Sequence, residues 1–229
     1  MALTRPSAAT RYTYDFVTAA LPGDARHILE IGCGDGALAA LLQADGLGVV
    51  AIDSDPQSVD LAKTSGVDAR LLEWPCSIGT AFDAVLFTRS LHHIEALGDA
   101  VLAAKQALKP GGRLIVEDFR AEGGDDAGYH WFAERSRALI EQGALDATLD
   151  ELLEKVEPGG HDLHSSSAIA AALREVGSVG ATDAAYYFRY LEQHLRRPAQ
   201  ADELLAKELS LIAAGSIGPL GNRFVGTVD

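Results

Sequence analysis

Three closely spaced glycines follow a short apolar run, and an aspartate stands at the end of the next apolar run. The first run is HILEI (27–31), the turn is GCGDG (32–36), and the residues that follow have a helical pattern. Such a turn offers backbone N–H groups and a close approach to a nucleotide-like ligand. Asp53, 17 positions beyond Gly36, can accept hydrogen bonds from both hydroxyls of a ribose. The pattern predicts a site for an adenosine-type ligand.

The glycine turn alone leaves the class of ligand open. Gly32, Gly34 and Gly36 also suit a tight turn without a ligand. They suit equally the phosphate loop of a dinucleotide-dependent oxidoreductase, with Ala37 as the third small residue. Asp53 has a second interpretation as a solvated helix cap, although Asp55 fits that role better.

Strand-like and helix-like segments alternate around this turn. Such alternation predicts an α/β fold with a mostly parallel sheet that is covered by helices on both faces. The predicted strands are 27–31, 47–53, 69–73, 82–88, 113–119, a segment near 180–190, and 222–228. The predicted helices are 11–21, 37–45, one beginning at Pro56, 95–108, 166–176, and one through Leu205, Leu209 and Ile212.

The stretch from 120 to 165 interrupts this alternation. A polar, glycine-rich segment is followed by two helical patterns, of which Leu145, Leu149, Leu152 and Val156 form the clearer one. We interpret the stretch as an inserted helical lid over an acceptor pocket. The expected organisation is a single domain over 1–229, with a cofactor-binding core at about 26–119, the lid at about 120–165, and C-terminal strands and helices at about 166–229.

Four segments together resemble the class I S-adenosylmethionine-dependent methyltransferases, in particular the small-molecule methyltransferase group. They are ILEIGCGDG (28–36), VVAIDSD (49–55), FDAVLFTRSLHHI (82–94) and ALKPGGRLIVED (107–118). The resemblance implies a Rossmann-like, doubly wound sheet of seven strands with the last strand antiparallel. It also implies S-adenosyl-L-methionine as the cofactor.

The resemblance assigns cofactor contacts around the glycine turn. It places Glu30 near the positively charged end of the cofactor, while backbone groups of the turn at Gly32, Cys33 and Gly34 hold the methionine part. A sulfonium has no phosphates to bind and is favoured by nearby negative charge. Glu30 therefore argues against a dinucleotide site. Asp53, with Ser54 beside it, is expected at the ribose.

Two further pairs of residues complete the expected cofactor site. The resemblance places Glu73 at the adenine amino group, and Trp74 beside it either stacks on the adenine or packs in the core. Thr88 and Arg89, where the fourth strand ends, are expected to border the homocysteine part and the substrate.

Two adjacent histidines follow the fourth strand. A hydroxyl acceptor must lose a proton during in-line methyl transfer, whereas some other acceptors need no base. His93 and His92 are the candidate general bases. The alternative is that one of them packs inward at the start of a helix.

Charge and composition limit the kind of partner. The formal net charge is −14, which works against a nucleic acid or an anionic membrane as partner. The N-terminal residues contain no apolar core of signal-peptide length, and no later apolar stretch approaches the length of a membrane span. A cytoplasmic location and a small-molecule substrate are therefore expected. Cys33 and Cys76 lack the spacing of a disulfide or metal framework. The sequence does not indicate the acceptor atom or the oligomeric state.

The sequence also allows two other functions. An NAD(P)-dependent oxidoreductase of Rossmann type would need a Tyr-Lys or similar pair, and Tyr186 and Tyr187 have no lysine three or four positions further on. The other is a non-catalytic binding subunit that retains the adenosine pocket, or an oligomerisation module. It would bind the cofactor without turning over an acceptor.

Overall fold

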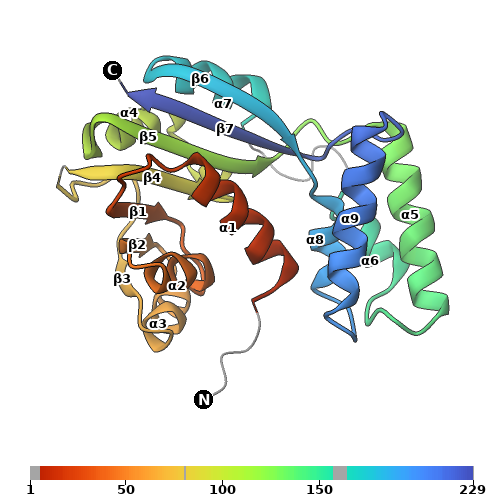
Figure 1. Ribbon diagram of the computed structural model, residues 1–229. Coiled ribbons are helices and arrows are strands. Elements are labelled where there is room, and N and C mark those ends of the chain that lie inside the picture. Colours follow the sequence, from red (N-terminus) through yellow and green to blue (C-terminus); the bar gives the residue numbers. More distant parts are fainter. Residues whose placement is uncertain (1–5, 80, 157–163, 229) are drawn as a thin grey trace. The chain divides into compact units, whose positions relative to one another are not determined.

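The computed structural model describes residues 6–79, 81–156 and 164–228. Helices and strands alternate through most of this part of the chain (Figure 1). The strands are β1 (His27–Ile31), β2 (Gly48–Asp53), β3 (Asp68–Leu71), β4 (Phe82–Thr88), β5 (Leu108–Phe119), β6 (Gly177–Ala184) and β7 (Gly221–Val228). The helices are α1 (Ala8–Ala20), α2 (Ala37–Ala44), α3 (Pro56–Thr64), α4 (Leu97–Ala107), α5 (Asp126–Glu141), α6 (Leu149–Leu153), α7 (Ser166–Arg174), α8 (Tyr187–Glu192) and α9 (Gln200–Ala213), with a 3₁₀ turn η1 (Leu91–His93).

The strands form one seven-stranded sheet in the order β3-β2-β1-β4-β5-β7-β6. Strands β1 to β5 are parallel, with Leu29 opposite Val50 on one side and Val85 on the other. Strand β7 runs in the opposite direction (Figure 1). The strand order reverses direction at β1, so the carboxyl ends of β1, β2 and β4 border one crevice. This confirms the predicted doubly wound, Rossmann-like α/β sheet with its last strand antiparallel.

Neighbouring residues of each central strand pack on opposite faces of the sheet. Ile28 and Leu86 belong to the core beneath α1, α2 and α3, whereas Leu29 and Phe87 belong to the core beneath α4 and α7. Figure 1 shows these two layers of helices on either side of the sheet. Because strand side chains alternate, each apolar run needs cover on both sides.

Residues at the ends of elements explain several boundaries. Asp55 caps α3, because its carboxylate accepts hydrogen bonds from the N–H groups of Gln57 and Ser58, and Pro56 occupies the first helical position. Helix α4 ends at Ala107, before Pro110. Strand β5 already begins at Leu108, whereas the sequence predicted a start at 113. An irregularity in the β4–β5 register accommodates the additional residues.

The chain is divided into two compact units. One contains the described residues of Met1–Ala9, Phe119–Ser166 and Asp183–Asn222, and the other those of Thr10–Asp118, Ser167–Thr182 and Arg223–Asp229. The expected lid, 120–165, falls in the first unit, where its described residues contain α5 and α6. Residues 157–163 of the expected lid lie outside the described residues.

Two predicted elements are wrong in their bounds. The strand predicted near 180–190 ends at Ala184, and the residues from Tyr187 form helix α8. Glu208 of α9 accepts hydrogen bonds from the backbone N–H groups of residues 186, 187 and 188, which satisfies the start of this helix. The helix predicted from the pattern between Leu145 and Val156 is shorter in the structure, where α6 spans Leu149–Leu153.

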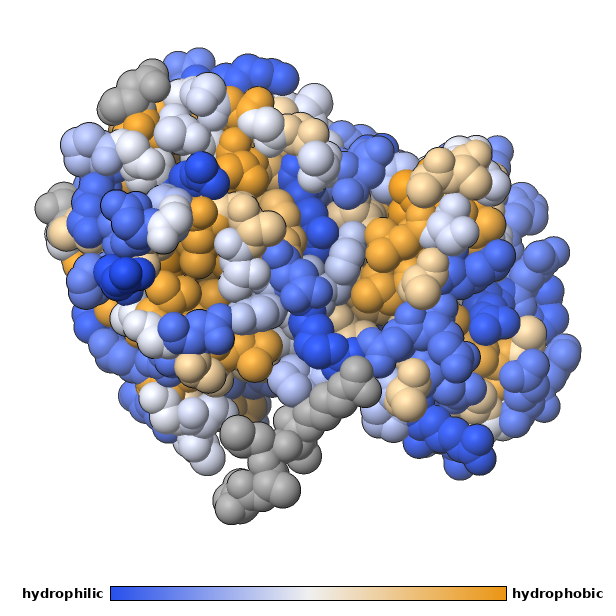
Figure 2. Space-filling view, in the orientation of Figure 1, coloured by the Kyte–Doolittle hydropathy of each residue, from blue (hydrophilic) through white to orange (hydrophobic). Residues whose placement is uncertain are grey.

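The large exposed hydrophobic side chains lie on different elements. They include Leu61 of α3, Leu71 of β3 and Leu102 of α4. On the face shown in Figure 2, hydrophilic residues border the hydrophobic areas. Scattered exposed leucines of this kind are ordinary on a protein surface. None of the helices in the described part of the chain combines the length and apolarity that a membrane span requires.

Candidate cofactor and active site

The glycine turn after β1 has a backbone that ordinary residues rarely adopt. Gly32 and Gly34 have φ values of +73° and +54°. A Cβ atom on Gly32 would lie 2.3 Å from Cβ of Ser90, so this position admits no side chain. A Cβ atom on Gly34 would meet nothing within 4 Å, so the turn leaves open space at that position.

Asp53, at the end of β2, is hydrogen-bonded to this turn. Its Oδ2 atom accepts a hydrogen bond from the N–H of Gly34 at 2.9 Å, and Oδ1 accepts one from the N–H of Asp55 at 2.9 Å. A carboxylate has about four lone-pair positions, so these two hydrogen bonds leave about two of them available.

A pocket of about 700 Å³ lies where β1, β2 and β4 end. Its volume falls in the usual range for small-molecule sites. Eight of the predicted cofactor and base residues line it: Gly32, Gly34, Asp53, Ser54, Glu73, Trp74, Arg89 and His93.

Trp74 packs in the core and also lines the pocket. Its side chain is only 7% exposed, it packs edge-on against Phe87, and its Nε1–H donates to the carbonyl of Ala100 at 3.0 Å. The same residue lines the pocket beside Glu73. The core therefore fixes the indole ring at the wall of the pocket.

A second, smaller pocket of about 230 Å³ lies against the glycine turn and α1. It brings together the predicted residues Glu30, Gly32, Cys33, Gly34, Thr88 and Arg89, and adds Thr10, Thr13, Asp35, Ala37 and Leu38. The two pockets share Gly32, Gly34 and Arg89.

Glu30 is a buried carboxyl group with unsatisfied hydrogen-bonding capacity. Its side chain is 1% exposed, and Oε1 contacts Thr88 Oγ1 at 3.5 Å. Among the described residues, no hydrogen-bond partner reaches Oε2. Burial raises the pKa of Glu30 to about 8, against the opposing influence of the Arg89 charge. A buried acid of this kind favours a cationic ligand, which would restore its ionised form.

Cys33 lies in the same turn and is held in its thiol form. Burial raises its pKa to about 12, with further contributions from the negative charges of Glu30 and Asp53. Cys33 is therefore unsuited to act as a nucleophile.

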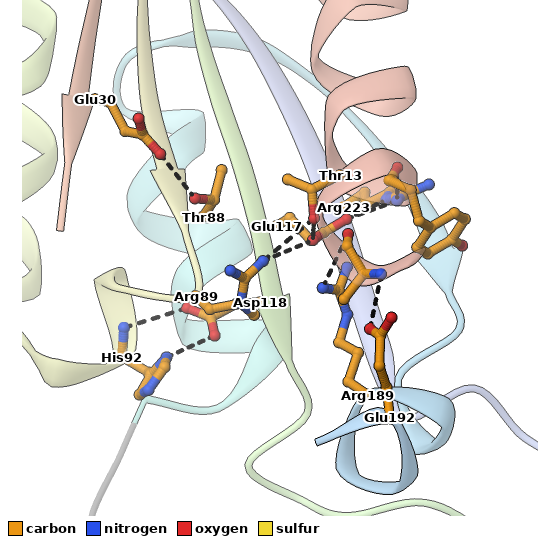
Figure 3. A network of polar contacts seen from close by, with 12 residues as sticks. Thr13, Glu30, Thr88, Arg89, His92, Glu117, Asp118, Arg189, Glu192 and Arg223 are labelled. Atoms are coloured by element: carbon orange, nitrogen blue, oxygen red, sulfur yellow. Dashed lines mark hydrogen bonds and ion pairs between the residues drawn. The ribbon is translucent and has the colours of Figure 1, made fainter. Parts of the chain in front are cut away.

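The two histidines of the candidate base lie in different environments. His92 is buried, and its Nδ1 lies 2.6 Å from Oδ1 of Asp118, whose Oδ2 accepts the backbone N–H of His92 at 3.2 Å (Figure 3). His93 is exposed and lines the larger pocket. The rings lie 3.9 Å apart between centroids. His92 is absent from the linings of both pockets in the described part of the chain.

A buried ionic network that was not predicted from the sequence lies beside the smaller pocket. Glu117 of β5 pairs with Arg223 of β7 at 2.6 Å and accepts the hydroxyl hydrogen of Thr13 at 2.6 Å (Figure 3). Arg223 also lies over the ring of Tyr12, 3.8 Å from its centroid. The network joins α1 to the sheet. Only the position of Glu117, near the carboxyl end of a central strand, could have signalled it.

The described residues contain no group of three or more His, Cys, Asp or Glu side chains arranged to hold a metal ion.

Comparison with known proteins identifies the class of this chain. The family described as "Methyltransferase domain" matches residues 7–178. The chain belongs to this methyltransferase-domain family, and the cofactor of the class is S-adenosylmethionine. The dinucleotide-dependent oxidoreductase is not favoured.

Two curated relatives match about half of the chain. The ubiquinone biosynthesis O-methyltransferase of Xylella fastidiosa (strain 9a5c) is 33% identical over 115 residues, which cover 44% of this chain and 45% of the relative. An uncharacterized methyltransferase of Mycobacterium bovis is 35% identical over 113 residues, which cover 46% of this chain and 57% of the relative. The chain thus matches only about half the length of these relatives.

A solved structure resembles nearly the whole fold. It is a SAM-dependent methyltransferase of Thermotoga maritima, described as a possible histamine N-methyltransferase. It is 16% identical, has a TM-score of 0.61, and the match covers 96% of this chain and 89% of that chain. At this identity the likeness shows the fold alone.

Proposed function

We propose that the chain transfers the methyl group of S-adenosylmethionine to a small-molecule acceptor. The observation that carries the proposal is the buried Glu30 carboxyl group, whose Oε2 atom has no partner among the described residues. It lies beside a glycine turn that leaves open space at Gly34. A cationic amino acid sulfonium fits this combination better than a pyrophosphate does.

Each end of the cofactor has residues suited to it. Asp53 would hold the ribose with its remaining lone pairs, and Glu73 would accept the adenine amino group beside the face of Trp74. The backbone at Gly32, Cys33 and Gly34 would border the methionine part, with Glu30 near its ammonium group. Ser54 and Thr88 would line the ribose and methionine ends respectively. When bound, the cofactor supplies an electrophilic methyl group.

We assign the general base to His93, for acceptors that must lose a proton. His93 is exposed in the larger pocket, whereas His92 is buried against Asp118. His92 would act as a positioning residue, because its contact with Asp118 fixes the backbone from which His93 projects. The protein would otherwise contribute by bringing acceptor and methyl group into line.

The class of acceptor is proposed from a relative's name and from the net charge. The relative from Xylella fastidiosa is named an O-methyltransferase of ubiquinone biosynthesis, so hydroxylated aromatic compounds are the first acceptors to test. The net charge of −14 disfavours nucleic acid as acceptor. The role of residues 120–165 as a lid over the acceptor pocket remains a prediction.

Calorimetry and a turnover assay test this function. Purified protein should bind S-adenosylhomocysteine and should not bind NAD or NADP. With S-adenosylmethionine and a panel of phenols, amines and thiols, it should release S-adenosylhomocysteine and a methylated product identified by mass spectrometry. Binding of a nicotinamide dinucleotide without binding of S-adenosylhomocysteine would refute the proposal. Cofactor binding without turnover of any acceptor would favour the non-catalytic subunit.

A further inference from the structure

Arg89 has an unusual backbone conformation at the junction of the two pockets. It follows the last residue of β4 and has a φ of +64°, in the left-handed region that long side chains seldom adopt. Its N–H donates to the carbonyl of Glu117 at 2.7 Å, which ties this backbone to β5. Such conformations persist where surrounding structure holds them, and they are concentrated at ligand sites.

The guanidinium of Arg89 is only partly engaged by protein groups. Its Nη1 donates to Thr13 Oγ1 at 3.2 Å and lies 3.5 Å from Oε1 of Glu117. Arg223 approaches the same carboxylate more closely, at 2.6 Å, so the charge of Glu117 is largely matched by Arg223. Among the described residues, no hydrogen bond is seen from Nε or Nη2 of Arg89, and its side chain is 38% exposed.

Arg89 and Glu30 bring opposite charges to the smaller pocket. Both residues line this pocket, as does Gly34, which has open space where a side chain would lie. A zwitterionic amino acid carries an ammonium and a carboxylate on one carbon atom. A pocket lined by both a carboxyl group and a guanidinium therefore offers a partner for each of these charged groups.

We infer that Arg89 binds the α-carboxylate of the cofactor's methionine part, opposite Glu30 at the α-ammonium. This inference rests on the proposed function, and it adds a chemical partner for Arg89. The α-carboxylate is the only anionic group of S-adenosylmethionine. A carboxylate on the acceptor is the other source of the same chemistry, and the experiment below distinguishes the two.

Equilibrium binding without acceptor provides the test, because no turnover is involved. The probes are S-adenosylmethionine, its decarboxylated analogue, which differs only by the α-carboxylate, and 5′-methylthioadenosine, which lacks the whole amino acid part. Wild-type protein is compared with Arg89→Met, with Arg89→Lys, and with Arg70→Met. Arg70 is an exposed arginine of β3 that pairs with Asp68 and provides a matched control.

Arg89→Met should weaken the binding of S-adenosylmethionine by about tenfold to hundredfold. The affinities for the decarboxylated analogue and for 5′-methylthioadenosine should change less than about twofold. Arg89→Lys should restore part of the loss, because it keeps the charge without the planar fork. Arg70→Met should bind every probe as wild type does.

Several outcomes would overturn the inference. If Arg89→Met loses affinity for all three probes equally, Arg89 only supports the structure. If its affinity for S-adenosylmethionine is unchanged, Arg89 does not contact the cofactor. If Arg89→Met binds S-adenosylmethionine as tightly as the wild-type protein but no longer methylates acceptors that carry a carboxylate, Arg89 would be assigned to the acceptor.

Two further results distinguish failure of this inference from a folding defect of the variant and from failure of the proposed function. If Arg89→Met does not fold, as judged by thermal unfolding without ligand, the wild-type protein still decides. It should prefer S-adenosylmethionine to the decarboxylated analogue by at least about tenfold, and equal affinities would refute the inference. Wild-type protein that binds none of the three probes would refute the proposed function itself.

Discussion

The carboxylate of Asp53 connects two turns by accepting the N–H of Gly34 through Oδ2 and the N–H of Asp55 through Oδ1, both at 2.9 Å. One side chain at the end of β2 therefore orders the turn after β1 and the start of α3. A ligand that binds to Asp53 meets a carboxylate whose orientation is already fixed, and the entropy cost of binding is smaller.

Replacement of Asp53 should weaken the cofactor site. Asp53→Ala removes the expected ribose contacts and releases the N–H of Gly34, so the affinity for S-adenosylhomocysteine should fall by about 1 to 3 kcal/mol. Titration calorimetry measures this loss. Asp60→Ala, on the exposed surface of α3, is the matched control and should bind normally. An unchanged affinity in Asp53→Ala would remove this residue from the site.

The raised pKa of Glu30 should make cofactor binding depend on pH. With a pKa of about 8, the free protein holds Glu30 largely neutral at pH 7. A bound ammonium group favours the carboxylate, so binding should release a proton. The affinity for S-adenosylhomocysteine should then rise by up to about tenfold per pH unit below pH 8 and level off above it.

Calorimetry at pH 6, 7 and 8, in buffers of different ionisation enthalpy, checks the pH dependence of binding. Glu30→Gln should remove both the rise in affinity and the proton release. The same pKa implies that the stability of the free protein falls as the pH rises from about 4.5 to about 8, because the native state retains a proton that the unfolded chain loses. Equal affinities at pH 6 and pH 8 would contradict the assignment of Glu30.

Two glycine substitutions separate backbone strain from steric overlap. Gly32→Ala combines a positive φ with a Cβ contact of 2.3 Å to Ser90, and should destabilise the protein by about 2 to 4 kcal/mol. Gly66→Ala has a positive φ but meets nothing within 4 Å, and should cost about 1 to 2 kcal/mol. Urea unfolding measures both. Equal losses would show that the contact with Ser90 relaxes at little cost.

The two histidines should respond differently to removal. His92→Ala leaves the buried Asp118 without its 2.6 Å partner and should destabilise the fold by about 3 kcal/mol. His93→Ala should change stability by less than about 1 kcal/mol. With a hydroxyl acceptor, His93→Ala should lower kcat by about a hundredfold or more while leaving cofactor affinity intact. Full activity in His93→Ala would exclude it as the base.

The sequence predicts most of the sheet because local signals mark its strands. The bounds of β1 and β4 coincide with the prediction, since apolar runs end there at glycine or polar residues. Helix α8 was missed because its first N–H groups depend on Glu208, about twenty residues later in the chain. The residues around Tyr187 contain no pattern that would indicate a hydrogen-bonding partner at Glu208.

The candidate site divides in the same way. Glu30 and Asp53 belong to short motifs, and their positions at strand ends follow from the strands themselves. Thr13, Glu117 and Arg223 come from three distant segments, so the network that they form is visible only in the fold. The burial of His92 likewise depends on Asp118 of the neighbouring strand.

The protonated state of Cys33 has a consequence for the chemical stability of the protein beside the proposed methyl donor. A thiolate is a strong nucleophile, and a methyl donor held beside it would alkylate the protein instead of the acceptor. Burial, with smaller contributions from the negative charges of Glu30 and Asp53, raises the pKa of Cys33 to about 12, so the thiol stays protonated at neutral pH. The burial of the Cys33 thiol thus protects the glycine turn from self-methylation.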